Sequence, residues 1–250
     1  MATFVLVHGS YLGGWAWRWV TPHLRAAGHG VYVPSLTGVG ERVHLASPQV
    51  DLDTHITDVV NLLYYEDLTG VVLVGWSYGG SVVTGVADRV PERIAQIVYL
   101  DSDVPRDGET SFPPGFHAAK KEQASAMGDG WRLLPTWSAD DMAPELLEET
   151  RHWMFERMTP DLLNTRIQPI RLTGAGAAIP TTYVRCTADY DPADEMNRRE
   201  DARVRSEPTW HYRELAAGHG APLTAPQAVA DLLLEFVTST GTDRDPPGRQ

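Results

Sequence analysis

The chain has 250 residues, of which 42% are hydrophobic and 22% charged, a composition typical of a folded globular protein with a sizeable core. Its 33 acidic residues outnumber its 21 lysines and arginines, so the formal net charge is −12. Nucleic acids and anionic membrane surfaces are excluded as expected partners, because neither offers an opposite charge to such a chain.

Two further features of the sequence concern its surroundings. Cys186 is the single cysteine, so no internal disulfide is expected. The first residues carry no basic segment and only a short apolar run, and no stretch approaches the roughly 20 apolar residues of a membrane span. We therefore expect a cytoplasmic protein without a membrane partner, and a homodimer is allowed.

The first hundred residues alternate short β-rich runs with helical patterns, which favours a mostly parallel sheet covered by helices on both faces. Helices are expected from Thr21 to Gly28, from about Asp51 to Tyr65, and around Val82–Ala87 with an end before Pro91. The predicted strands are Phe4–Val7, Val31–Pro34, Val71–Val74 and Ile94–Leu100.

The pattern changes in the middle of the chain, where no strand-like run appears between about residues 104 and 180. Helical segments are expected there from about Pro144 to Met158 and from Thr159 onward. We interpret residues 105–180 as a helical cap over one end of the sheet.

After this segment the sheet is expected to resume. The remaining predicted elements are strands at Thr181–Cys186 and near Trp210–Arg213 and a closing helix from Thr224, whose Thr-Ala-Pro-Gln matches a capping box. Residues 1–104 and 181–238 thus form the predicted core. The polar, Pro- and Gly-rich residues 239–250 are expected to be a disordered tail.

The sharpest chemical signal is Gly75-Trp76-Ser77-Tyr78-Gly79, which fits G-x-S-x-G. It follows a predicted buried strand and precedes a predicted helix, the setting of a serine nucleophile on a tight turn. The N-terminal end of that helix favours negative charge that develops at the site. Ser77 is therefore the predicted nucleophile.

A serine hydroxyl needs a base that takes its proton. His219 is the predicted base, because it lies late in the chain, between glycines, in a loop after a predicted strand. His211 is a weaker candidate, since it falls within the strand pattern. Three other histidines are interpreted as structural: His8, His55 and His152.

The base in turn needs a carboxylate that fixes its tautomer. Asp189 is the predicted acid. When the nucleophilic serine lies on a strand-to-helix turn, the expected chain order is Ser, acid, His, and Asp189 follows the strand Thr181–Cys186. Asp191 is expected to start a turn with Pro192. Asp101 and Asp103 are a second acid position, for which a turn or capping role is favoured.

A tetrahedral intermediate requires two backbone donors for its oxyanion. The predicted donors are the N–H of Tyr78, next to the nucleophile, and that of Ser10, in the loop after the first strand. The sequence holds no P-loop, no H-E-x-x-H and no paired-cysteine zinc spacing. No cofactor and no metal are expected.

Several motifs together resemble one branch of the α/β-hydrolase superfamily. That branch holds plant methylesterases, hydroxynitrile lyases and bacterial esterases such as pyrethroid hydrolases. The resemblance implies an α/β-hydrolase fold, a cofactor-free triad of Ser77, His219 and Asp189, and oxyanion donors at Ser10 and Tyr78. The motifs are Phe4–Gly9, Gly13–Trp17, Leu36–Arg42, Gly75–Gly79 and Ala217–His219.

Three positions refine the resemblance. Hydroxynitrile lyases of this branch usually carry a lysine after the catalytic histidine and a threonine in the first loop, whereas this chain has Gly220 and Gly9. The sequence is thus more similar to the esterases. The bacterial members usually have a histidine before the nucleophile, where this chain has Trp76, either packing under the turn or reshaping the pocket.

The expected function is hydrolysis of small, in some cases aromatic, carboxylic esters through an acyl-enzyme. Two alternatives stay open: a lyase or biosynthetic tailoring enzyme that uses the same triad, and a small-molecule receptor of the same fold. The aromatic residues proposed for the substrate pocket are Tyr11, Trp76, Trp131, Trp137 and Trp153.

Overall fold

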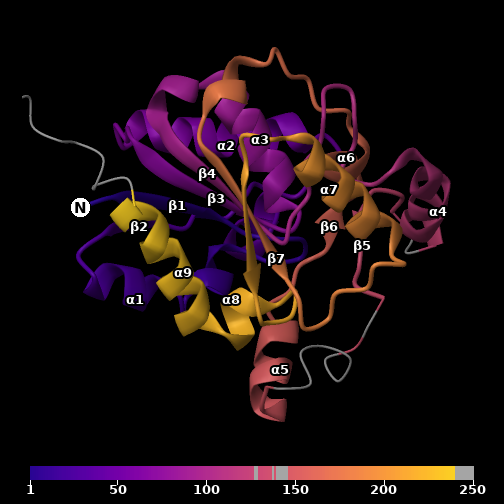
Figure 1. Ribbon diagram of the computed structural model, residues 1–250. Coiled ribbons are helices and arrows are strands. Elements are labelled where there is room, and N and C mark those ends of the chain that lie inside the picture. Colours follow the sequence, from indigo (N-terminus) through magenta and orange to yellow (C-terminus); the bar gives the residue numbers. More distant parts are fainter. Residues whose placement is uncertain (127–128, 137, 139–145, 240–250) are drawn as a thin grey trace, which may run out of the picture.

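The computed structural model describes residues 1–126, 129–136, 138 and 146–239. Within them, six parallel strands form one sheet in the order β2-β1-β3-β4-β7-β8 (Figure 1). The mostly parallel sheet expected from the sequence is confirmed. The strands are β1 (Thr3–Val7), β2 (Gly30–Tyr32), β3 (Val71–Trp76), β4 (Ile94–Leu100), β7 (Thr181–Cys186) and β8 (His211–Leu215).

The strands β1, β3 and β4 are buried on both faces of the sheet, which explains why they are apolar at nearly every position. Successive side chains of a strand point to opposite faces. Phe4 and Leu6 pack on the face covered by α1 (Thr21–Ala26) and α9 (Pro226–Ser239). Val5 and Val7 pack on the face covered by α2 (Leu52–Tyr65) and α3 (Gly79–Arg89). The two helix pairs lie on opposite sides of the sheet in Figure 1.

Local sequence signals explain where α2 begins. The Asp51 carboxylate accepts the Thr54 N–H at 2.9 Å, and the Thr54 hydroxyl oxygen accepts the Asp51 N–H at 3.4 Å. These two bonds form a capping box that satisfies backbone donors of the first turn. The predicted start at Asp51 therefore differs from the observed helix only by the capping residue itself.

The segment between β4 and β7 differs from the sequence-based expectation. The expectation of no strand there is wrong, because Arg132–Leu133 (β5) and Asp161–Leu162 (β6) pair as antiparallel strands. Two residues are too few to show a strand periodicity in the sequence. The helices of this segment are α4 (His117–Ala126), α5 (Glu148–Phe155) and α6 (Leu163–Ile167).

Two predicted helix starts in the chain are also corrected. The helix expected from Thr159 begins only at Leu163, because Asp161 belongs to β6 and accepts the Tyr11 N–H at 2.9 Å. Thr224 is the last residue of a short helix, α8 (Ala221–Thr224), rather than the cap of α9. Its hydroxyl donates to the Gly220 carbonyl at 3.4 Å.

Neither α4 nor α7 was predicted from the sequence. Helix α7 (Glu195–Ser206) begins after Asp194, whose side chain accepts the Asn197 N–H at 3.0 Å. Glu200 and Arg203 are buried on this helix, so its inner face is largely charged. A helix whose buried face is charged carries little of the apolar periodicity by which helices are recognised in a sequence.

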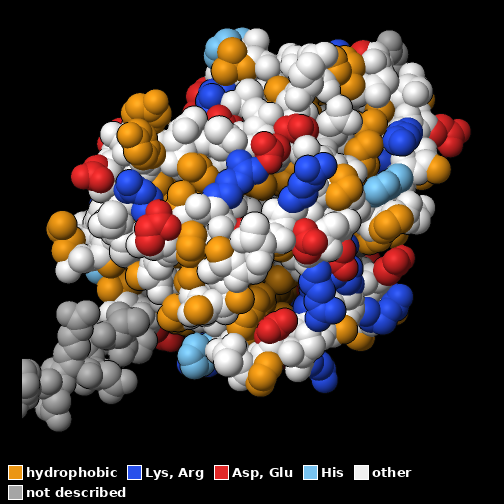
Figure 2. Space-filling model, turned by 90° about the horizontal axis from the view of Figure 1, so that it is seen from above, with side chains coloured by type: hydrophobic (Ala, Val, Ile, Leu, Met, Phe, Trp, Pro, Cys, Tyr) orange, Lys and Arg blue, Asp and Glu red, His pale blue; other side chains and the backbone are white. Residues whose placement is uncertain are grey.

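The ends and surface of the molecule complete this description. Ser239, assigned above to the tail, is the last residue of α9, and the other residues of that predicted tail lie outside the described part of the chain. Among the described helices, none combines the length and apolar character needed to cross a membrane. Acidic and basic side chains lie interspersed on the face shown in Figure 2.

Candidate active site

Ser77 lies on a strained turn between β3 and α3. Its φ is 55°, in the left-handed region that a non-glycine residue enters at a cost. The flanking glycines make the turn feasible. A Cβ on Gly75 would lie 2.7 Å from the Gly79 carbonyl oxygen, and one on Gly79 would lie 2.6 Å from that of Val7. The turn therefore presents the serine hydroxyl at the carboxyl edge of the sheet.

His219 lies directly beside this hydroxyl. The loop between β8 and α8 carries it, and its Nε2 lies 3.1 Å from Ser77 Oγ. About half of the imidazole surface is accessible, and His219 lines the cavity described below. The structure thus brings together the predicted nucleophile and the predicted base, which are 142 residues apart in the chain.

The carboxylate behind the imidazole is Asp101 rather than the predicted Asp189. Asp101 Oδ2 lies 2.7 Å from His219 Nδ1. Asp101 directly follows β4 and has a φ of 42°, so its backbone is strained in the same sense as that of Ser77. The prediction that Asp189 contacts the imidazole is corrected by this geometry.

Asp189 contacts the backbone of the same histidine. Its Oδ2 accepts the His219 N–H at 2.7 Å, and its side chain packs against Gly218, where a Cβ would lie 3.0 Å from that oxygen. Asp189 therefore fastens the loop that carries His219, while its carboxylate stays away from Nδ1. Asp191 lies at the start of a turn, as proposed from the sequence, and its side chain accepts the Ala193 N–H at 2.8 Å.

The contact between Asp101 and His219 shifts the pKa of both groups. Burial by itself would lower the pKa of His219, but the hydrogen bond and the negative charge of Asp101 raise it above 6.5. Burial would raise the pKa of Asp101, but the hydrogen bond from His219 and the positive charges of His219 and Arg185 lower it. The carboxylate is thus held ionised behind the ring.

Asp101 is itself held by several donors. Its Oδ1 accepts a hydrogen bond from Arg185 Nη1 at 2.9 Å and from the Cys186 N–H at 3.3 Å. Arg185 is buried in β7, and its Nη2 donates to Asp201 of α7 at 2.7 Å. These contacts leave Oδ2 free to face the imidazole.

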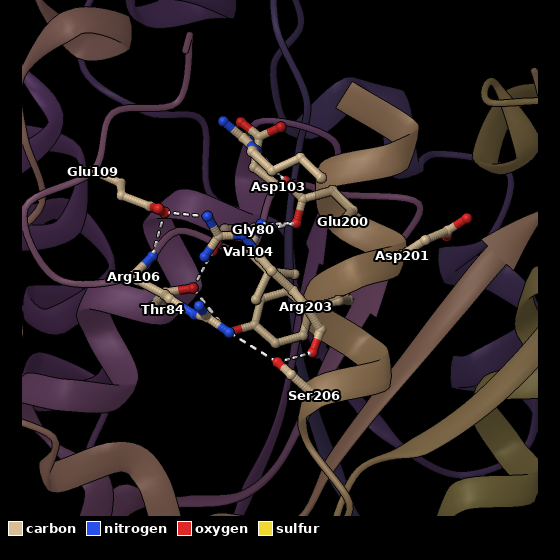
Figure 3. Close-up of polar contacts among 12 residues, drawn as sticks. Gly80, Thr84, Asp103, Val104, Arg106, Glu109, Glu200, Asp201, Arg203 and Ser206 are labelled. Carbon is tan, nitrogen blue, oxygen red and sulfur yellow. Dashed lines mark hydrogen bonds and ion pairs between the residues drawn. The ribbon is translucent and has the colours of Figure 1, made fainter. Parts of the chain in front are cut away.

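The loop that follows Asp101 is also fastened to α7 (Figure 3). Glu200 accepts the Val104 N–H at 3.0 Å, and Arg203 pairs with Glu109 of the same loop. Burial raises the pKa of Glu200 to about 7. On the other side, the Asp103 N–H donates to the Ser77 carbonyl at 3.1 Å, so the nucleophile turn and the acid loop form one unit.

The two predicted oxyanion donors also lie at this site. Within the described residues, no acceptor takes the backbone N–H of Ser10 or of Tyr78. His8 is buried and holds the loop of Ser10: its Nδ1 lies 2.8 Å from the Gly9 carbonyl and its Nε2 accepts the Leu36 N–H at 3.2 Å. Burial lowers the pKa of His8 to about 4, so the ring stays neutral.

A cavity of about 1020 Å³ opens in front of Ser77 and His219. Of the aromatic residues proposed from the sequence, Tyr11 and Trp76 line it. Trp153 packs instead against Trp15, with ring centroids 5.6 Å apart. Trp131 is also absent from the described lining, and Trp137 lies outside the described residues. Lining residues that the sequence did not indicate include Phe112, Lys120, Met154, Met158 and Arg166.

Trp76 has a clear structural task. It is buried, and its Nε1 donates to the carbonyl oxygen of His219 at 2.8 Å. Its ring also contacts that of Trp17, with centroids 6.0 Å apart. Trp76 thus both lines the cavity and anchors the histidine loop, which unites the two interpretations drawn from the sequence.

This bond makes a prediction for the variant Trp76→Phe. A neutral hydrogen bond contributes about 0.5–1.5 kcal/mol, so we expect kcat to fall roughly three- to tenfold as the histidine loop loosens. Trp17→Phe is the matched control, because among the described residues Trp17 Nε1 has no acceptor. Steady-state kinetics with one ester would check this, and an equal loss of kcat in both variants would contradict it.

Within the described residues, no group of three or more His, Cys, Asp or Glu is arranged to hold a metal ion. The polar side chains at the site contact one another: the Ser77 hydroxyl contacts the His219 imidazole, which contacts the Asp101 carboxylate. Such a chain can transfer a proton from a hydroxyl to an imidazole and stabilise the resulting charge.

The family model described as "Alpha/beta hydrolase family" matches residues 4–232. The chain belongs to this family. It is 36% identical over 249 residues to a carbendazim hydrolyzing esterase of Nocardioides sp. (strain SG-4G), a match that covers 93% of this chain and 98% of the relative.

Two further comparisons agree with this assignment. A pheophorbidase of Raphanus sativus is 27% identical over 94% of each chain. The solved structure of an extracellular α/β-hydrolase from a Paenibacillus species is similar to this chain with a TM-score of 0.78 at 24% sequence identity. The match covers 94% of this chain and 98% of the Paenibacillus chain, and it supports the fold but not a shared activity. The predicted branch is confirmed, since methylesterases and an α-hydroxynitrile lyase of Arabidopsis thaliana are also similar to this chain.

Proposed function

We propose that Ser77, His219 and Asp101 hydrolyse the substrate of this carboxylic ester hydrolase through an acyl-enzyme. The single observation that carries the proposal is the continuous set of contacts from Ser77 Oγ to His219 Nε2, at 3.1 Å, and from His219 Nδ1 to Asp101 Oδ2, at 2.7 Å. This is the arrangement by which an imidazole activates a serine hydroxyl.

In the first step Ser77 Oγ attacks the ester carbonyl carbon while His219 Nε2 takes the hydroxyl proton. Asp101 stabilises the imidazolium that forms, and the backbone N–H groups of Ser10 and Tyr78 receive the oxyanion. Loss of one such donor typically costs about 2.7–4 kcal/mol of barrier. His219 then gives its proton to the leaving alcohol, whose bond to the carbonyl carbon breaks.

In the second step a water molecule replaces the alcohol. His219 takes a proton from this water, the resulting hydroxide attacks the acyl carbon, and the bond to Ser77 Oγ breaks as the serine recovers its proton. The product is a carboxylic acid that contains one oxygen atom from the solvent. No cofactor enters either step.

The cavity supports a small organic ester as the substrate. A volume of about 1020 Å³ is at the upper end of the range for small-molecule sites. Its lining includes apolar side chains such as Leu12, Met154 and Leu223. The relative from Nocardioides is named for carbendazim hydrolysis, so small esters with an aromatic part are the first class to test.

Two measurements test this function directly. We expect a fluorophosphonate probe to label Ser77 stoichiometrically, as located by peptide mass spectrometry. We also expect hydrolysis of small aryl and methyl esters in ¹⁸O-labelled water to place one labelled oxygen in the acid. Labelling elsewhere, or a product acid without solvent oxygen, would overturn the proposed acyl-enzyme route.

A further inference from the structure

Two basic side chains face the same cavity as the serine hydroxyl. Lys120 of α4 and Arg166 of α6 line it together with Ser77, and they also line a neighbouring cavity of about 570 Å³ that shares Ser77 and His219. They flank one ring: the Phe112 centroid lies 4.2 Å from the Arg166 guanidinium carbon and 5.1 Å from Lys120 Nζ. The chain as a whole has a net charge of −12, so this pairing of cations is a local exception.

Arg166 is only partly satisfied by the protein. Its side chain is 7% exposed, its Nη1 donates to Ser10 Oγ, and Nη1 also lies 3.6 Å from Asp161 Oδ2. In the described part of the chain its Nε has no acceptor, and Asp161 Oδ2 has no hydrogen-bond donor. Nε is itself fully buried, so this unused donor is not offered to the cavity, and the charge of the guanidinium is paired with the Asp161 carboxylate.

Lys120 has even less compensation for its charge. The hydrogen-bond partner of its Nζ is the neutral Gln123 side chain, at 3.1 Å. Burial and the positive charge of Arg166 lower the pKa of Lys120. Lys120 therefore brings to the cavity wall a positive charge that forms no ion pair within the described residues.

The other acidic groups that line these cavities have partners of their own. Asp101 pairs with Arg185 and His219, and Glu200 pairs with Arg199 at 2.7 Å. Asp103 accepts hydrogen bonds from the Ser111 and Ser81 hydroxyls, and Asp189 accepts the His219 N–H. The fifth acidic residue of the lining, Asp194, accepts the Asn197 N–H at 3.0 Å, and within the described residues none of the five forms an ion pair with Lys120.

We propose that Lys120 and Arg166 form a subsite for one carboxylate of the substrate, so that the ester cleaved at Ser77 carries a second, unesterified carboxyl group. This inference rests on the proposed function and deepens it by naming the substrate class. A carboxylate would pair with the Lys120 ammonium, and a guanidinium and an ammonium both donate strong, charge-assisted hydrogen bonds to carboxylate oxygens.

Two matched pairs of esters test the subsite in turnover. The acyl pair is mono-4-nitrophenyl glutarate against 4-nitrophenyl pentanoate, and the alcohol pair is 4-carboxyphenyl acetate against 4-carbamoylphenyl acetate. In at least one pair we expect Lys120→Met to lower the anionic-to-neutral ratio of kcat/KM roughly tenfold, the scale of one charged hydrogen bond. Lys121→Met, which removes an exposed neighbouring charge, is expected to leave that ratio unchanged.

Binding to Ser77→Ala separates this inference from the proposed function. We expect calorimetry to give tighter binding of the anionic ester, and to lose that preference when Lys120→Met is added. If this holds while Ser77 in the unaltered protein resists the fluorophosphonate, the subsite stands and the acyl-enzyme fails. Unchanged ratios in both ester pairs, or equal losses in Lys120→Met and Lys121→Met, would overturn the subsite.

Discussion

Replacing Asp101 with asparagine is expected to lower kcat about 10⁴-fold, the scale seen when a serine hydrolase loses the carboxylate behind its imidazole. Asparagine has nearly the shape of aspartate but cannot hold His219 in the tautomer with a proton on Nδ1. The amide also loses its charge-assisted bond to Arg185, whose Nη1 lies 2.9 Å from Asp101 Oδ1. Steady-state kinetics on one ester would measure the loss, with thermal unfolding as a check on folding.

Asp189→Asn is the matched comparison for this variant. It changes a carboxylate that accepts the His219 backbone N–H at 2.7 Å, and an amide oxygen can still accept that bond. We therefore expect less than about a tenfold loss, the scale of one ordinary hydrogen bond. The reverse order, with the large loss in Asp189→Asn, would show that Asp189 replaces Asp101 behind the ring during turnover.

The pH dependence of kcat/KM gives a second measure of the same contact. His219 must be neutral to take a proton, and Asp101 raises the pKa of His219 above 6.5. The acidic limb of the profile should therefore lie above pH 6.5 in the unaltered protein. In Asp101→Asn the negative charge is gone, so the pKa of His219 falls and the limb should move to lower pH. A limb at the same pH in both proteins would contradict this assignment.

The difference between Asp101 and Asp189 shows how far a sequence can define such a site. Both residues follow neighbouring parallel strands, β4 and β7, so the sheet brings both to the same edge. Chain order could not decide between them. The decision depends on the left-handed backbone at Asp101, with a φ of 42°, which turns its side chain toward the ring and has no signature in the sequence.

Ser77 and His219 were predictable because their signals are local. The serine needs glycines at fixed offsets between a strand and a helix, and the histidine needs a glycine-flanked loop after a late strand. Lys120 and Arg166 have no such pattern. Their places in the cavity depend on how α4 and α6 are positioned beside Ser77, which residue types and spacings do not specify.

The central strands were predicted closely and α7 was not, for one physical reason. β3 and β7 are buried on both faces, and their runs of apolar or β-branched residues therefore made them recognisable as strands in the sequence. Helix α7 is held instead by charged contacts such as Glu200 with the Val104 N–H and Arg203 with Glu109 (Figure 3). A helix buried through ion pairs is as polar in sequence as an exposed one.

The largest loss is expected when Ser77 or His219 is removed. Ser77→Ala and His219→Ala should each lower kcat by about 10⁴–10⁶-fold, and the double variant should lose no more than either one, because the two groups act as a unit. Measuring kcat with one ester in the unaltered protein, the two single variants and the double variant completes a double-mutant cycle. Losses that multiplied in the double variant would contradict the contact of 3.1 Å between Ser77 Oγ and His219 Nε2 as the working pair.

A stability measurement on the same residue separates chemistry from folding. Ser77 has a φ of 55°, a conformation that costs alanine and serine about 1–2 kcal/mol and glycine almost nothing. Ser77→Gly should therefore unfold at a higher temperature than Ser77→Ala, while both are inactive. If glycine gave no gain in unfolding temperature, the turn would not be strained as described. If Ser77→Gly kept its activity, the hydroxyl would not be the nucleophile.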